Sequence, residues 1–176
     1  MTEMAIEKVL VRAAGAAPPA DEALRVVLLR ERGGDRRLPI WIGRDDGDAL
    51  AVRLAEQQTP RPLTIDLTAG LLAAAGVEVE RVTVNRLAER TFYAVVSLAN
   101  AGDVDARPSD ALTLALRVGA PVHVAEEVLA QAATVADDIA AELDEREQAL
   151  GCAGAEPWRE LEGAEVVAAR EAQRPR

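Results

Sequence analysis

Two alternating segments near the middle of the chain constrain its fold more than any other feature. Residues 77–87, "VEVERVTVNRL", and residues 91–99, "TFYAVVSLA", place apolar side chains on one face and charged or polar ones on the other. This period of two residues predicts β-strands, and the turn "AERT" is short enough to join them as a hairpin. We therefore expect an antiparallel pair with one face against the core.

The rest of the chain adds strands and helices around this hairpin. The expected elements are strands at 4–13, 22–32 and 38–43, helices at 44–58 and 64–75, the hairpin, a strand and a helix within "GDVDARPSDALTLALRVGAP" (102–121), and a short strand running into a helix at 122–131. A loop is expected at 14–21, where two prolines occur. The resulting order, β-β-β-α-α-β-β-β-α-β-α, mixes hairpins with crossovers. It predicts the α+β class, as one compact domain with a mixed sheet and packed helices.

Two of the expected helices share their start and stop signals. Each has an Arg-Pro pair, a Ser or Thr as N-cap, an Asp in the first turn and a terminating Gly: Arg61-Pro62, Thr64, Asp66 and Gly76, then Arg107-Pro108, Ser109, Asp110 and Gly119. An internal β-α-β duplication would explain this similarity. Shared helix-capping signals explain it nearly as well, so both explanations stay open.

Length and charge predict one main domain followed by an acidic tail. With 176 residues and 49% hydrophobic content, the chain can bury one substantial core. From Glu126 onward there are 13 acids against 5 Arg, so most of the net charge of -10 is concentrated there. We expect the domain over 1–130, a helix over 131–150 and a flexible acidic tail over 151–176.

Several function classes are excluded by single residue counts. Lys8 is the only Lys, so no P-loop can be built, and His123 is the only His, so no His-rich metal site exists. Cys152 is the only Cys, which excludes an intrachain disulfide and a cysteine-based zinc site. No signal peptide and no stretch of about 20 apolar residues occurs, so we expect a cytoplasmic protein without membrane contact.

The chemistry that remains is that of carboxylates and arginine. Asp105 and Asp110 flank Arg107 where a strand is expected to pass into a helix. Small carboxylates of this kind bind Mg²⁺ or Mn²⁺, and Arg can hold phosphate oxygens bidentately, so metal-assisted phosphodiester hydrolysis is physically feasible. Helix capping explains Ser109 and Asp110 without any ligand, at roughly 1 kcal/mol together. Capping does not require Asp105 or Arg107.

Four segments carry a resemblance to a known family. "LPIWIG", "PRPLTIDL", "TFYAVVSL" and "DARPSDALTLALRVGAPVHVAEEVL" resemble the bifunctional nuclease (DUF151) family over about residues 5–130. The resemblance implies an α+β domain, homo-oligomers, for which we expect a dimer, and divalent-metal cleavage of DNA and RNA in some members. The polar residues that match the family pattern are Arg61, Thr64, Asp66, Asp105, Arg107, Ser109 and Asp110, and Asp46 stands where relatives have an acid.

The leading hypothesis is a metal-dependent nuclease. Asp105, Asp110 and Asp66 would be catalytic, Asp105, Asp110 and Asp46 would hold Mg²⁺ or Mn²⁺, and Arg107, Arg61, Ser109 and Thr64 would bind the nucleic acid. One departure from the family pattern is Ile65, which stands where many relatives have His. If that His helps catalysis, the chain is expected to be weakly active or inactive, and if it only packs, Ile65 is a tolerable substitution. The alternative is a non-catalytic oligomeric interaction module whose Arg and Asp residues form a structural ion-pair network. A small-molecule-binding regulator is a third interpretation.

Overall fold

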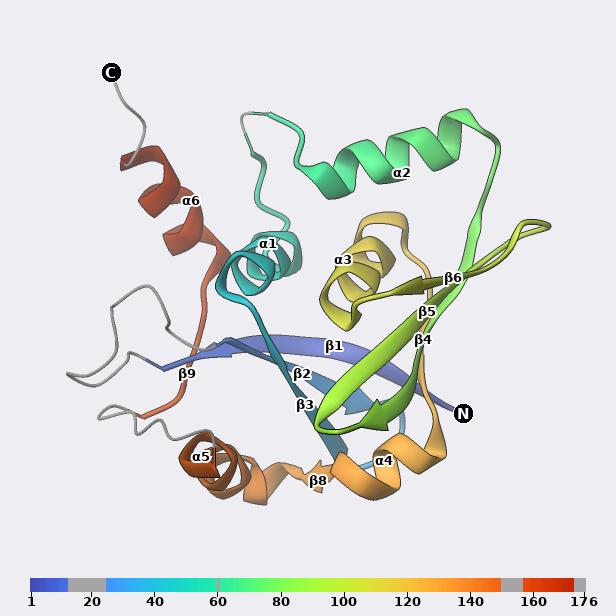
Figure 1. The fold of residues 1–176 in the computed structure, drawn as a ribbon. Helices are drawn as coiled ribbons and strands as arrows, with labels where there is room; N and C mark the ends of the chain where they lie inside the picture. The colour runs from blue at the N-terminus through green and yellow to red at the C-terminus, as the bar shows by residue number, and fades with distance from the viewer. Residues whose placement is uncertain (13–24, 60, 150–156, 173–176) are drawn as a thin grey trace.

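The computed structural model describes residues 1–12, 25–59, 61–149 and 157–172, and nine strands of these residues form one sheet (Figure 1). The strands are β1 (Thr2–Val11), β2 (Arg25–Glu31), β3 (Arg36–Ile42), β4 (Val79–Ala88), β5 (Thr91–Leu98), β6 (Gly102–Ala106), β7 (Val122–Val124), β8 (Thr134–Val135) and β9 (Arg159–Glu160). Their spatial order is β6-β5-β4-β7-β1-β2-β3-β8, and β9 pairs with β1. The pair β4–β7 is parallel and the other strand pairs described are antiparallel, so the sheet is mixed.

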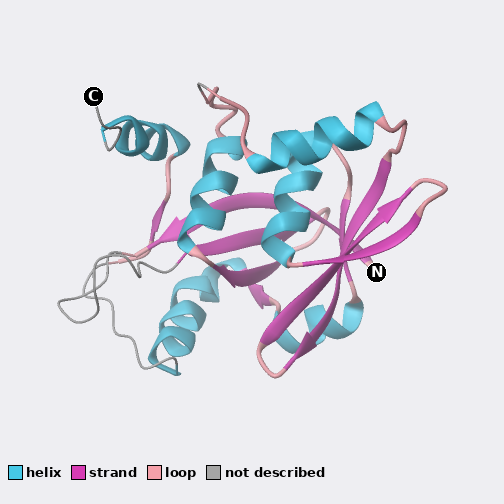
Figure 2. Cartoon of the chain, turned by 45° about the horizontal axis from the view of Figure 1, so that its top comes forward, coloured by secondary structure: helices cyan, strands magenta, loops and turns pink. Residues whose placement is uncertain are grey.

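Helices cover both faces of this sheet (Figure 2). They are α1 (Arg44–Leu54), α2 (Thr64–Ala74), α3 (Pro108–Val118), α4 (Glu126–Ala132), the 3₁₀ turn η2 (Ala136–Asp138), α5 (Ile139–Ala149) and α6 (Gly163–Ala172). α1, α2 and α3 lie on one side, and α4 and α5 lie on the other. The first eleven elements follow the predicted order, which confirms the α+β class. In the described residues, none of these helices is long and apolar enough to cross a lipid bilayer.

The hydrophobic core lies between the sheet and the helices α1 and α3. Leu29 of β2, Leu38 of β3, Leu50 of α1 and Leu112 of α3 have no exposed surface. Burying a Leu side chain of this kind stabilises the fold by about 1.5–3 kcal/mol. Because both helices insert their apolar faces into the same core, α1 and α3 pack against each other. Their first turns are therefore brought together at one edge of the domain.

The hairpin predicted from the alternating segments is confirmed as β4 and β5. Ala88 pairs with Thr91, so the turn contains only Glu89 and Arg90, and both have positive φ, 49° and 66°. A two-residue turn with positive φ at both central positions matches the right-handed twist of the flanking strands. β6 then pairs with β5 and forms the edge of the sheet next to α3.

The start of α2 differs from the prediction by one residue. The N-cap is Leu63 and Thr64 is the first helical residue, so the prediction of Thr64 as N-cap is wrong. Leu63 has no polar side chain, and the helix start is stabilised from inside instead: the Asp66 carboxylate accepts a hydrogen bond from the Leu63 N–H at 2.8 Å. The predicted stop at Gly76 is confirmed, since this residue has φ +69° after the last turn.

The start of α3 also lies earlier than predicted. Arg107 is the N-cap and Pro108 is the first helical residue, so Ser109 belongs to the first turn and does not cap it. Proline is favoured at this position because its fixed φ suits a helix and its missing N–H costs no hydrogen bond. Gly119 ends the helix in the left-handed conformation, as predicted. The two helices that share start and stop signals, α2 and α3, are preceded by different elements: α3 follows strand β6, whereas α2 follows helix α1.

The helix predicted within residues 131–150 is shorter in the structure. β8 and η2 precede α5, whose Leu143 is fully buried. Arg12, at the end of β1, holds this helix through Asp144 at 2.6 Å and Glu147 at 2.5 Å. Its guanidinium also lies 4.8 Å from the ring centre of Trp158, so residues near both ends of the chain meet at α5.

The structure differs from the prediction of a flexible tail over residues 151–176. β9 adds to β1 through the pairs Leu10–Glu160 and Val11–Arg159, and α6 packs against α1. Leu161 and Val166 are buried in the main core, which explains why this segment is attached. Residues 151–156 and 173–176 of the predicted tail lie outside the described residues.

Candidate functional site

A cavity of about 690 Å³ opens between α2, the first turns of α1 and α3, and the strands β5 and β6. Its apolar wall is formed by Leu63, Ile65, Leu72, Val96, Leu98, Val104 and Leu114. Its polar wall is formed by Asp45, Asp46, Thr64, Thr68, Arg107, Ser109, Asp110 and Thr113. Cavities of a few hundred Å³ with a small set of polar groups are typical sites for small organic ligands.

The polar wall contains an ion-pair cluster formed by Asp46, Arg107, Ser109 and Asp110, here called the Arg107 cluster. Arg107 binds Asp110 bidentately, with Nε–Oδ2 at 2.8 Å and Nη2–Oδ1 at 3.0 Å. Its Nη1 and Nη2 also reach Asp46 at 3.1 and 3.3 Å. The Ser109 hydroxyl donates to Asp46 Oδ2 at 3.1 Å. The packing of α1 on α3 thus joins residues that are more than 60 positions apart in sequence.

The Arg107 cluster is accessible to solvent and carries an excess negative charge. The side chains of Arg107 and Asp110 are 65% and 53% exposed, and that of Asp46 is 25% exposed. The hydrogen bond with Asp110, followed by the charge of Asp46, raises the pKa of Arg107. Two carboxylates for one guanidinium leave one uncompensated charge. Because the side chains of Arg107 and Asp110 are exposed, a ligand can reach them in the folded protein.

A second cluster, here called the Asp66 cluster, contains Arg53, Asp66 and Arg117. Arg117 Nε donates to Asp66 Oδ1 at 2.7 Å, and Arg53 Nη2 donates to the same oxygen. Arg53 is in the last turn of α1 and Arg117 in the last turn of α3. The Asp66 cluster therefore lies at the C-terminal ends of the two helices whose N-terminal ends carry the Arg107 cluster.

Asp66 is a structural carboxylate rather than an accessible one. Its side chain is only 13% exposed. Burial alone would raise the pKa of Asp66, but the Leu63 N–H, the hydrogen bond from Arg117 and the charges of Arg53 and Arg117 together lower it. Its hydrogen bonds stabilise the start of α2 and tie it to α1 and α3. It does not line the 690 Å³ cavity.

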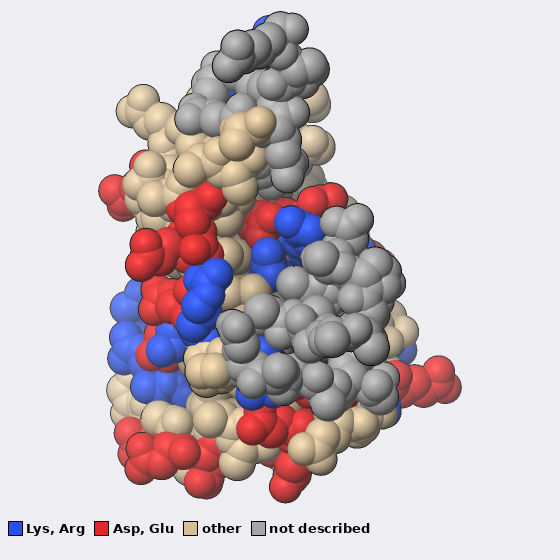
Figure 3. All heavy atoms as spheres, turned by 90° about the vertical axis from the view of Figure 1, so that its left-hand side faces the viewer, with Lys and Arg blue, Asp and Glu red and all other residues tan. Residues whose placement is uncertain are grey.

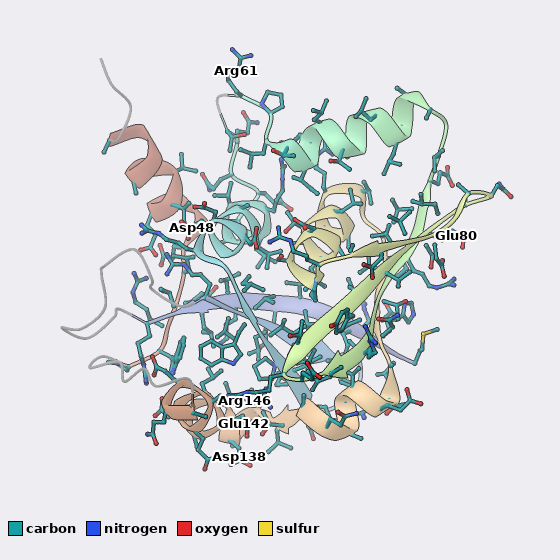
Figure 4. All side chains as sticks on the ribbon, viewed as in Figure 1. Asp48, Arg61, Glu80, Asp138, Glu142 and Arg146 are labelled. Atoms are coloured by element: carbon teal, nitrogen blue, oxygen red, sulfur yellow. The ribbon has the colours of Figure 1, made fainter. Side chains whose placement is uncertain are left out.

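Two other predicted site residues lie away from the Arg107 cluster. Val104 and Ala106 line the cavity, so Asp105 between them on β6 projects from the opposite face of the strand. Arg61 sits on the loop between α1 and α2, and its side chain points away from the molecule (Figure 4). Neither residue lines the cavity that the Arg107 cluster borders.

The first residues of α2 do face that cavity. Thr64 and Ile65 both line it, so Ile65 borders the same cavity as the Arg107 cluster. Ile65 contributes an apolar surface there and no proton donor or acceptor. His123 lies on β7 between β1 and β4 and lines neither this cavity nor the one beside the Asp66 cluster.

The predicted metal site is only partly assembled. Among the described residues, no three His, Cys, Asp or Glu side chains are grouped so that they could hold a metal ion. The predicted ligand set of Asp105, Asp110 and Asp46 is therefore not brought together, because Asp105 projects from the other face of β6. Asp46 and Asp110 do converge, and Mg²⁺ commonly takes one or two protein carboxylates with water completing its shell. These two carboxylates fit such an ion, in competition with the Arg107 guanidinium.

Sequence reasoning did not identify Arg53 and Arg117. Both are basic residues in the last turn of a helix, where a positive charge complements the helix dipole. That signal predicts a stabilising role for each residue, but not that both would meet one carboxylate.

On the face shown in Figure 3, basic side chains are interspersed with acidic ones.

Comparison with known proteins gives a consistent assignment for the central segment. The sequence model of the bifunctional nuclease domain matches residues 27–137, which contain both ion-pair clusters. An uncharacterized protein of Mycobacterium tuberculosis H37Rv, and its counterpart in strain CDC 1551, are 48% identical over 113 residues, covering 64% of this chain and 69% of theirs. Bifunctional nuclease 1 of japonica rice is 28% identical over 105 residues, covering 56% of this chain and 32% of the rice protein.

Proposed function

Because the chain belongs to the bifunctional nuclease domain family, we propose that it hydrolyses phosphodiester bonds of DNA or RNA at the Arg107 cluster. One observation supports this site above others: an exposed guanidinium is held in a fixed position by two carboxylates at the mouth of a large cavity. The rice relatives that carry the name bifunctional nuclease add support at the level of the family.

In the proposed reaction, Arg107 binds the phosphate. Its planar guanidinium can hold two phosphate oxygens at once, and its present carboxylate partners show that it adopts bidentate geometry. A phosphate that draws the guanidinium away releases Asp110, the more exposed carboxylate, to accept a proton from the attacking water. Asp46 keeps the hydrogen bond from Ser109 and so positions the start of α3.

A divalent cation is part of the proposal. Asp46 and Asp110 would hold Mg²⁺ or Mn²⁺ when Arg107 turns toward the phosphate, and such an ion lowers the pKa of bound water and neutralises developing charge. Asp105 and Asp66, which were predicted as catalytic residues, are not included, because one projects from the far face of β6 and the other is enclosed by arginines.

The test is a cleavage assay on single-stranded DNA and RNA with added Mg²⁺ or Mn²⁺. Arg107→Ala and Asp110→Asn should each lower the rate by roughly 100-fold, the scale found when one transition-state contact is removed. Arg32→Ala removes an equally exposed Arg from the turn between β2 and β3 and is the matched control. Wild-type rates in the Arg107 and Asp110 variants, with a wild-type preparation that cleaves, would refute the assignment.

A second candidate function is an oligomeric interaction module. Leu67 and Leu71 lie one turn apart on α2 and are 60% and 62% exposed, which is a large apolar surface for a helix in contact with water. A second copy of the chain covering this face would explain it. Sedimentation analysis should then show a dimer that the double variant Leu67→Ser, Leu71→Ser converts to a monomer, and a monomeric wild-type protein would contradict this function.

A further inference from the structure

We propose that a second cavity, between the C-terminal ends of α1 and α3, binds a phosphate-type oxyanion independently of the Arg107 cluster. This cavity has a volume of about 620 Å³ and shares no lining residue with the one described above. Three arginines from three different segments line it: Arg53 of α1, Arg61 of the following loop and Arg117 of α3. It is here called the arginine pocket.

The arginine pocket has more positive charge than its carboxylates compensate. Asp66 serves Arg53 and Arg117 with the same oxygen, Oδ1, while its Oδ2 accepts from the Leu63 N–H. One carboxylate is thus shared by two guanidinium groups. Arg61 lies at the rim of the pocket, where its guanidinium points outward (Figure 4) and has no carboxylate partner among the described residues. Glu56 is the other acid of the lining.

Hydrogen-bond donors in this pocket also lack acceptors. Arg117 uses only its Nε for Asp66, which leaves its two terminal nitrogens available at a side chain that is 43% exposed. Gln57 and Gln58 supply amide groups to the same lining. An oxyanion with several oxygens is the ligand class that satisfies many such donors at once.

The positive charge of the arginine pocket is opposite in sign to the net charge of the whole chain. The chain carries a net charge of -10, so its overall field repels anions. Arginines in the last turns of α1 and α3 are explained by the helix dipoles, but this does not explain why Arg61 lies on the same pocket. The volume exceeds that of one phosphate group, and the arginines are distributed over three segments. A ligand with several linked phosphates therefore fits better than a single phosphate ion.

The test uses inorganic tripolyphosphate and the metal-free full-length protein, with binding measured by isothermal titration calorimetry. Saturable binding to one site is expected, and Arg61→Ala should raise the dissociation constant roughly tenfold, as loss of one charge-assisted hydrogen bond would. Arg61 is exposed and has no ion-pair partner among the described residues, so this variant should fold normally. Arg117→Ala is the second variant, with its melting temperature measured in parallel.

Two controls separate this pocket from the proposed nuclease site. Arg32→Ala, which removes an exposed arginine elsewhere, should bind tripolyphosphate as the wild type does, and Arg61→Ala should weaken binding as much in an Arg107→Ala background as in the wild type. Because the readout is binding without cleavage, a failed nuclease assay leaves this test unaffected. No saturable binding, or binding lost in Arg107→Ala and retained in Arg61→Ala and Arg117→Ala, would overturn the proposal.

A competition experiment identifies the source of the phosphate. The first outcome is that a short single-stranded oligonucleotide binds, is displaced by tripolyphosphate, and binds more weakly to Arg61→Ala. This result would show that the pocket holds the backbone of a nucleic-acid strand. Tripolyphosphate binding without competition by the oligonucleotide would show that the ligand is a free phosphate compound. Both results require the arginine pocket.

Discussion

Replacing Asp66 with Asn is expected to lower the free energy of unfolding by about 3 kcal/mol, although the substitution hardly changes the size of the side chain. The carboxylate accepts hydrogen bonds from Arg53, Arg117 and the Leu63 N–H, and it is largely buried. An Asn side chain has one acceptor oxygen, so its NH₂ group must face one of these N–H donors.

The magnitude follows from the three contacts. Loss of the charge-assisted bond with the partly buried Arg53 contributes about 1.5 kcal/mol, and the pair with the more exposed Arg117 contributes about 0.5–1 kcal/mol. The contact with the first turn of α2, including the helix dipole, contributes about 1 kcal/mol. For a chain of this size, about 3 kcal/mol corresponds to a fall of roughly 6–12 °C in melting temperature.

Urea unfolding followed by far-ultraviolet circular dichroism measures this change. Asp110→Asn is the matched control, because Asp110 also pairs with an Arg and occupies the first turn of a helix but is 53% exposed. It should change the free energy of unfolding by less than about 1 kcal/mol. A loss below about 1 kcal/mol for Asp66→Asn, or an equal loss for both variants, would refute the distinction between a structural and an accessible cluster.

Four further predictions follow from contacts described above. Gly163→Ala should destabilise the chain by about 1–3 kcal/mol in urea unfolding, because a Cβ there would lie 2.6 Å from a backbone oxygen of α1; no change would mean that α6 does not pack as described. Ile65→His, which adds a titratable group to the cavity, should raise the cleavage rate as the pH increases through about 6.5, and a flat pH–rate profile would contradict a catalytic role for this position. Arg107→Ala should bind Mn²⁺ more tightly than the wild type in calorimetry while cleavage falls, since it removes the competing cation; weaker binding would place the ion elsewhere. The Arg36 hydrogen bond lowers the pKa of Glu126 to about 2, so a carboxyl NMR titration should find this group ionised at pH 3, where an ordinary Glu is mostly protonated.

Asp66 also makes the stability depend on pH in a defined direction. Its pKa is lower in the folded protein than in the unfolded chain, so folding is favoured when the carboxylate is ionised. This contribution is complete above the unfolded value of about 3.9 and is lost as the pH falls through the folded value. Asp66→Asn should therefore flatten the part of the stability curve below pH 4, measured by urea unfolding at several pH values. An unchanged slope would show that other carboxylates dominate there.

The order of elements could be predicted because it depends on local patterns. The alternation in residues 77–99 specifies a hairpin, and the glycines at 76 and 119 end helices because glycine adopts the left-handed conformation at little cost. Helix starts were less predictable. Leu63 and Arg107 are N-caps although neither has a typical capping side chain, because Asp66 and Pro108 stabilise the first turns from inside the helix.

The candidate site could be predicted only as a set of residues, because its division into two clusters depends on tertiary packing. Asp66 and Ile65 are neighbours in sequence, yet they face different cavities, since successive helical residues point about 100° apart. Asp105 and Asp110 do not meet because Asp105 projects from the face of β6 that is opposite the cavity. A strand was predicted here, but the sequence pattern did not show which of its two faces Asp105 would occupy. Arg53 and Arg117 meet at Asp66 because the last turns of α1 and α3 both lie next to the first turn of α2.

The central position of β1 affects how the chain can fold during synthesis. β1 pairs on one side with β2, which follows it closely, but on the other side with β7 and β9, near residues 122–124 and 159–160. At about 5–20 residues per second, the ribosome needs roughly 6–22 s to make the 110 residues between β1 and β7. During this interval one edge of β1 has no strand to pair with, and its unpaired N–H and C=O groups are open to other chains. Nascent or truncated chains that end before β7 should therefore aggregate through this edge, and they should depend on chaperones more than the complete chain does.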